Sequence, residues 1–143
     1  MPLAGIAALV IAALFAGAAV YVSAVEHPAR MTLDTDEALR EWGPSYHRGA
    51  IMQASLALLG TAAGAAAWWM ARNPWWLAGA IFMLANWPWT LLVIMPLNRR
   101  LKAMAKASAD SSARELLDKW ARLHLMRTAF GILATLSFAV AAA

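Results

Sequence analysis

The sequence contains no cysteine, which excludes disulfide bonds, thiolate nucleophiles and cysteine-bound metal sites. Charge is also scarce, since 14% of the 143 residues are charged, against roughly 25% in a soluble domain. The basic residues behind the net charge of +4 are concentrated in one connection between apolar segments, so we expect no nucleic-acid partner. Hydrophobic residues make up 62% of the chain, and this composition predicts an integral membrane protein.

Four segments are long and apolar enough to cross a bilayer, which takes about 20 residues per helix. We therefore expect an all-α fold in which residues 1–143 form one domain, a four-helix transmembrane bundle. The predicted helices span residues 3–25, 46–71, 75–97 and 113–142, and a short amphipathic helix is expected at 35–42. The first apolar run has no basic segment before it and is long for a signal peptide, so we expect it to be an uncleaved helix.

Prolines set the expected boundaries of these helices. Pro28 is expected to end the first helix, and Pro88 to kink the third. Gly43 and Pro44 are expected to stop the short amphipathic helix.

The distribution of Lys and Arg predicts the orientation in the membrane. Three lie in the first polar connection and seven in the second, whereas the short turn between them has only Arg72. Because Lys and Arg favour cytoplasmic loops, both polar connections are expected in the cytoplasm and both termini on the other, non-cytoplasmic side.

Three histidines fall in one layer at the cytoplasmic ends of the predicted helices: His27, His47 and His124. His124 also shares a helical face with Trp120 and Arg127, four residues before it and three after it. Ionisable groups inside an apolar segment usually face a bundle interior or a wet cavity. This spacing favours His124 as a base and Arg127 as a cation that holds an anion; the alternative is that Arg127 reaches lipid phosphate.

Other polar residues lie at or below the histidine layer. Asn98 and Tyr46 belong to it, and Gln53 lies one heptad after Tyr46 on the same helical face. Asn86 lies deeper in the membrane than the histidine layer. It is expected either to line a binding site or to form hydrogen bonds with backbone groups that Pro88 leaves free.

A metal or haem site is an alternative use of the same layer. His27, His47 and His124, with Glu26, could bind Cu, Fe or Zn, because imidazole and carboxylate groups suit these metals. No local ligand motif such as H-E-x-x-H is present, so the ligands would have to meet across helices.

Residues 86–101 and 116–127 resemble the two main motifs of the anthrone oxygenase-like family of small membrane proteins, the domain of unknown function 1772 group. Residues 42–49 are similar to a weaker first-loop pattern of that family. The resemblance implies a four-helix bundle and, as for members in fungal pigment and toxin pathways, oxidation of an anthrone to an anthraquinone by O2. It also implies site residues at Asn98, Trp120, His124 and Arg127. Residues 26–28 resemble bacterial-type members, and we expect a bacterial inner membrane protein.

The leading hypothesis is a membrane oxygenase that oxidises an anthrone-type or other phenolic polycyclic substrate with O2. His124 or His47 would act as the general base, while Arg127 and Asn98 would stabilise the oxyanion. The substrate-binding residues in this hypothesis are Trp120, Trp42, Tyr46, Asn86 and Gln53. This hypothesis requires no cofactor. The expected partners of the protein are the lipid bilayer, an apolar aromatic molecule and O2, and a homo-oligomer is compatible with the hypothesis. A further alternative is a non-enzymatic scaffold or lipid-binding membrane protein.

Overall fold

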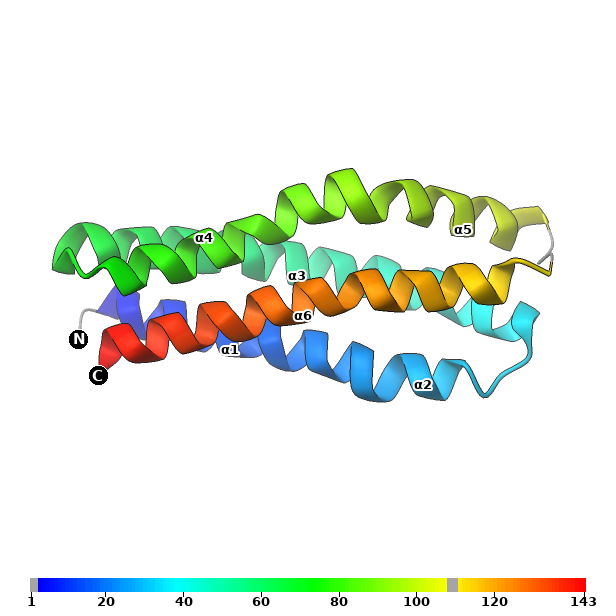
Figure 1. Ribbon diagram of the computed structural model, residues 1–143, viewed down its shortest axis with the longest axis horizontal. Helices are drawn as coiled ribbons and strands as arrows, with labels where there is room; N and C mark the ends of the chain where they lie inside the picture. The colour runs from blue at the N-terminus through cyan, green and yellow to red at the C-terminus, as the bar shows by residue number, and fades with distance from the viewer. Residues whose placement is uncertain (1–2, 108–110) are drawn as a thin grey trace.

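The computed structural model describes residues 3–107 and 111–143, and these residues contain no strand. Four long helical rods lie side by side, as Figure 1 shows. The rods span Leu3–Arg30, Thr35–Ala71, Pro74–Ala107 and Ala113–Ala142, and each is long and apolar enough to cross a membrane. The predicted four-helix transmembrane bundle is therefore confirmed.

Two of the rods are built from three consecutive elements. The first comprises α1 (Leu3–Tyr21), a π-helical turn η1 (Val22–Glu26) and α2 (His27–Arg30). The third comprises α4 (Pro74–Trp89), a second π-helical turn η2 (Thr90–Ile94) and α5 (Met95–Ala107). The other two rods are the single helices α3 (Thr35–Ala71) and α6 (Ala113–Ala142).

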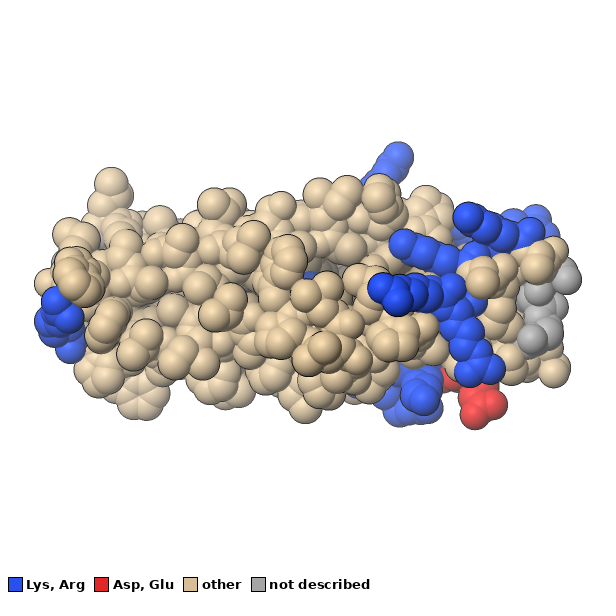
Figure 2. Space-filling model, turned by 90° about the horizontal axis from the view of Figure 1, so that it is seen from above, with Lys and Arg blue, Asp and Glu red and all other residues tan. Residues whose placement is uncertain are grey.

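The rods form a square, because α1 and α4 each pack against both α3 and α6. Both termini lie at the same end as the α3–α4 turn, and the two polar connections lie at the other end (Figure 1). We call these the terminal end and the polar end. On the face that Figure 2 shows, Lys and Arg side chains gather mainly at the polar end, and the body between the two ends carries almost no charge.

The predicted helix ends were wrong at three places, all toward the polar end. The first rod continues past residue 25 to Arg30, because the π-helical turn η1 directly before α2 accommodates the missing N–H of Pro28. Gly43 and Pro44 do not stop a helix at residue 42, since both lie inside the 37-residue α3. The third rod runs to Ala107, ten residues beyond its predicted end. Consequently all four rods extend beyond the membrane-spanning length.

Both π turns are associated with a proline. Pro88 lies two residues before η2, and Pro28 lies two residues after η1. A proline removes one backbone donor from the helical ladder, and a switch to i→i+5 bonding accommodates the disturbance. The kink expected at Pro88 thus takes the form of a π turn, and such turns are frequent at functional sites.

The terminal half of the bundle is packed through glycines. A Cβ atom added to Gly79 would lie 2.3 Å from the Phe138 ring, and one added to Gly64 would lie 2.7 Å from the same ring. A Cβ atom on Gly60 would lie 2.7 Å from Met83. The small residues between 60 and 67 therefore bring the helices close together, as the sequence predicts.

Candidate functional site

The site is organised around Arg127, a cation buried inside the bundle. It projects from α6 and is only 6% exposed. Among the described residues no carboxylate pairs with it, and its Nε has no hydrogen-bond partner there. Its guanidinium carbon lies 5.7 Å from the centre of the Phe15 ring, which closes the site toward the terminal end. A buried charge without a counter-ion is costly, so its environment suits an anionic or strongly polar ligand.

Arg127 lines two adjacent cavities. The smaller, of about 40 Å³, lies between the first rod, α3 and α6. The predicted site residues in its wall are Glu26, Tyr46, Gln53, Trp120, His124 and Arg127. Three rods therefore contribute predicted site residues to the wall of one cavity.

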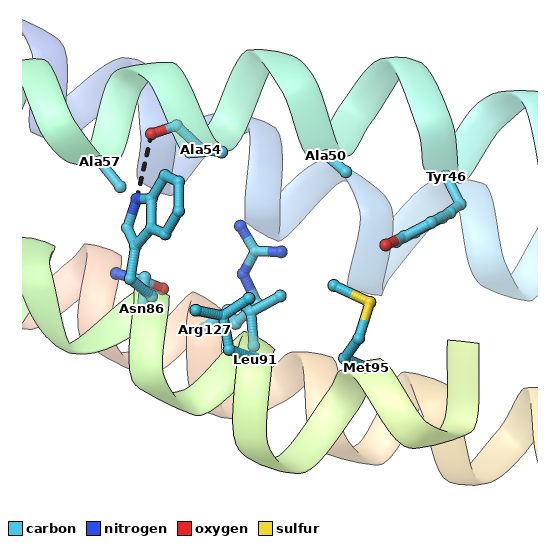
Figure 3. Close-up of a pocket in the computed structure, with 10 residues that line it drawn as sticks. Tyr46, Ala50, Ala54, Ala57, Asn86, Leu91, Met95 and Arg127 are labelled. Carbon is cyan, nitrogen blue, oxygen red and sulfur yellow. Dashed lines mark hydrogen bonds between the residues drawn. The ribbon is translucent and has the colours of Figure 1, made fainter. Parts of the chain in front are cut away.

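The larger cavity, of about 170 Å³, lies between α3 and the third rod. Tyr46, Ala50 and Arg127 line both cavities, so these three side chains separate them. Figure 3 shows Arg127 reaching into this space from behind, between Asn86 and Met95 on one side and the alanines of α3 on the other. The wall is otherwise apolar apart from Asn86 and Thr90.

His124 is held by contacts on two sides. A hydrogen bond of 3.3 Å joins its Nδ1 to Ser23 Oγ, and Ser23 Oγ lies 3.1 Å from Thr128 Oγ1. On the other side, its ring stacks on Trp120 at a centroid distance of 5.2 Å. These contacts fix the orientation of the imidazole, as the geometry of a proton-transferring group requires.

An aromatic series connects His124 to Asn98. Trp120 meets Trp42 edge to face at 6.1 Å, and Trp42 stacks on Tyr46 at 5.0 Å. Asn98 Nδ2 donates a 2.9 Å hydrogen bond to the Tyr46 hydroxyl. Asn98 and Trp42 thus contact the wall of the site through Tyr46 and do not line either cavity themselves.

Several polar atoms at the site are buried without a hydrogen-bond partner among the described residues. Within the cavity walls they are Gln53 Oε1, Asn86 Oδ1, Thr90 Oγ1, Trp120 Nε1 and Arg127 Nε. Asn86 Nδ2, by contrast, donates 3.2 Å hydrogen bonds to the carbonyls of Phe82 and Met83 in its own helix. Because most buried polar atoms in proteins are paired, such a concentration suits a site that binds a polar ligand.

The four ligands of the metal alternative do not converge. His47 is exposed on the outside of α3, and Glu26 pairs with the buried Arg30. His27 faces Asp118, with 3.4 Å between Nε2 and Oδ1. Within residues 3–107 and 111–143, no group of three or more His, Asp or Glu side chains is arranged to hold a metal ion.

Sequence reasoning missed two residues of the site region. Ser23 lies in the π turn η1 and contacts His124, but in the sequence it is one hydroxyl in a long apolar run. Arg30 is 3% exposed and pairs with Glu26 and Glu41 from two rods. The Glu26 and Arg30 spacing of four residues was a usable signal, because such pairs meet on one helical face.

Fold and site together define a four-helix membrane protein with a histidine between its helices and a buried cation that pairs with no carboxylate in the described part of the chain. The sequence model described as anthrone oxygenase matches residues 42–137, and the chain belongs to this family. The chain is 28% identical over 137 residues to a protein named anthrone oxygenase from Claviceps purpurea (strain 20.1), over 86% of this chain and 79% of that protein. No solved structure matches it. Family membership indicates an oxygenase-type function.

Proposed function

We propose that the protein is a membrane oxygenase that oxidises an anthrone-type or related phenolic polycyclic substrate with O2. One observation carries the proposal: Arg127 is buried, unpaired among the described residues and next to His124 in a shared cavity wall. A base beside a fixed cation is the arrangement needed to form and stabilise an enolate.

The reaction begins with removal of a proton from the CH2 group opposite the substrate carbonyl, with His124 as the base. The electron pair of the broken C–H bond moves into the ring system, and the carbonyl oxygen becomes an oxyanion beside Arg127. The carbanion reduces O2 to form a C–O–O⁻ group, which takes the proton back as a hydroperoxide. Loss of water leaves a second carbonyl, so one O2 converts CH2 to C=O and H2O.

The surrounding residues have defined parts in this proposal. Ser23 orients His124 through its hydrogen bond to Nδ1, and Tyr46 lies between the two cavities beside the oxyanion position. Asn98 positions Tyr46. Trp120 and Trp42 form an aromatic wall, and Trp120 contacts His124 directly. No step requires a cofactor, because the carbanion itself supplies the electrons.

The test is oxygen uptake by the purified protein in lipid nanodiscs, with a panel of anthrones. His124→Ala is expected to abolish uptake, whereas His47→Ala is the matched control in the same layer and is expected to retain it. Equal activity of both variants would contradict His124 as the base, and no uptake with any anthrone would contradict the substrate class. Activity that disappears on chelation and returns with one metal would contradict the cofactor-free reaction.

We also propose that the polar end, and with it the site, faces the cytoplasm of a bacterial inner membrane. The concentration of Lys and Arg at that end supports this orientation (Figure 2). Protease cleavage in sealed inside-out vesicles checks it, because the polar end would be accessible there and protected in right-side-out vesicles.

A further inference from the structure

The larger cavity opens sideways, between α3 and η2. Leu91 lines it and is 50% exposed, and its neighbour Leu92 is 76% exposed. On the α3 side Ile51 is 58% exposed. The mouth of this groove is therefore rimmed by exposed aliphatic side chains, a surface that suits lipid chains better than water.

The depth of the groove places its mouth within the bilayer. At 1.5 Å per residue, Ala57 lies about 22 Å and Ala50 about 33 Å from the α3–α4 turn at the terminal end. The hydrocarbon of a bilayer is about 30 Å thick. The groove thus crosses the boundary of the hydrocarbon nearest the polar end, with Ala57 inside the hydrocarbon and Ala50 in the interfacial region.

Polarity changes from the mouth of the groove to its inner end. Ala50, Ala54 and Ala57 form one wall and recur at helical spacing, which gives a smooth and narrow surface. Arg127 and Asn86 lie at the inner end (Figure 3). A ligand that fits this gradient is a thin apolar body with one anionic or carbonyl oxygen.

The volume indicates how such a ligand would lie. An enclosed cavity of about 150 Å³ accommodates benzene. A cavity of about 170 Å³ therefore holds little more than one ring, and a larger fused system must extend through the mouth. The open side toward the lipid permits this arrangement. His124 lines only the smaller cavity, so a ligand held in this way is in an entry position and has not yet brought its reacting carbon to the base.

We propose that the groove between α3 and η2 is a membrane-facing binding site that takes a flat, bilayer-soluble aromatic molecule directly from the hydrocarbon, with its oxygen at Arg127. That the ligand is aromatic rests on the proposed function. The groove, its opening toward the lipid and its buried cation are independent of that function. Ala54 and Leu91 are the residues that set the width of the entrance from its two walls.

Trp87 supplies a reporter at this site. It lines the groove, and its Nε1 donates a 3.4 Å hydrogen bond to the Ala54 carbonyl. The experiment measures quenching of Trp87 fluorescence by a hydroxyanthraquinone in phosphatidylcholine vesicles. The Trp87 signal is the difference between the chain and its Trp87→Phe variant, which removes the contribution of the other tryptophans.

Saturable quenching of Trp87 is the expected result. Ala54→Phe and Leu91→Phe narrow the groove from opposite walls and should weaken the apparent affinity by about tenfold or more, a loss of about 1.4 kcal/mol. Ala62→Phe is the matched control, because Ala62 is an exposed alanine of α3 outside the groove. Thermal unfolding of each variant separates loss of binding from loss of the fold.

Three results would overturn the proposal: quenching that never saturates, equal affinity in Ala54→Phe and Ala62→Phe, or displacement of the probe by an equal concentration of oleate. The last result would assign the groove to a lipid carboxylate. Binding is measured without turnover, so the two proposals can fail separately. Saturable quenching without oxygen uptake would support the groove and contradict the proposed function, and oxygen uptake without saturable quenching would do the reverse.

Discussion

The two halves of the bundle differ in how their helices pack: the terminal half is closely packed, whereas the polar half contains cavities. In the terminal half, Phe138, Phe15 and Met83 are fully buried among alanines, and glycines on α3 and α4 admit the Phe138 ring. In the polar half, Trp42 and Trp120 belong to the buried cluster, two cavities open, and polar atoms remain without partners in the described residues. Close packing thus holds the rods together in one half and lets the other half keep space for a ligand.

The largest expected effect comes from Arg127→Met, which should affect activity and stability in opposite directions. Loss of a group that stabilises an oxyanion typically lowers kcat by about 100- to 1000-fold. Removing a buried charge that has no counter-ion should leave the melting temperature unchanged or raise it. Oxygen uptake and thermal unfolding check the two parts, with the exposed Arg122→Met on the same helix as control. A clear loss of stability would show that Arg127 has a structural role.

Gly79→Val should show the reverse pattern, because it acts in the closely packed half. Its Cβ would meet the Phe138 ring at 2.3 Å, so the helices must move apart. Overpacking of this kind costs about 1–3 kcal/mol of stability. Gly17→Val is the control, since nothing lies within 4 Å of a Cβ there. Activity per folded molecule should be retained, and equal melting temperatures for the two variants would contradict the packing argument.

Tyr46→Phe should cost about 1 kcal/mol of stability, since it removes one hydrogen bond from Asn98. The stacking on Trp42 would remain, so the polar half should stay folded. The measurement is a double-mutant cycle with Asn98→Ala, scored by thermal unfolding and by KM. Fully additive effects would show that the Tyr46–Asn98 hydrogen bond contributes nothing.

The smallest expected effect is that of Ser23→Ala. Its hydrogen bond to His124 is 3.3 Å long, and its loss should lower kcat by less than about tenfold while KM stays unchanged. Ser55→Ala is the control, because Ser55 is an exposed serine whose hydroxyl donates a hydrogen bond to the Ile51 carbonyl in its own helix. An unchanged kcat would show that Trp120 alone suffices to orient the imidazole.

The sequence predicted the four spans because each carries a run of apolar residues, which is a local property. It also predicted the shared face of Trp120, His124 and Arg127, because helical spacing is fixed once the helix is known. The sequence placed His47 in the site because of its depth alone. His47 follows Tyr46 by one residue, so its side chain points about 100° away from that of Tyr46.

The helix ends and the cavity walls depended on tertiary contacts that spacing does not encode. Gly43 and Pro44 lie within a helix because the rods extend together beyond the membrane and Trp42 is buried among them. The contact between Ser23 and His124 joins residues 101 positions apart, through a π turn that no propensity scale indicates.

The π turn η1 also bears on how the length of this chain can change. An i→i+5 turn holds one residue more than the α-helical turn it replaces. Deleting a single residue between Val22 and Glu26 would restore regular α-helix without breaking the rod. Because the extra residue is confined to the wide turn, the residues on the two sides of the deletion would keep their faces relative to each other. Glu26 and Arg30 would stay in the bundle interior, so η1 marks a position where the chain can lose one residue while the side chains on either side keep their places.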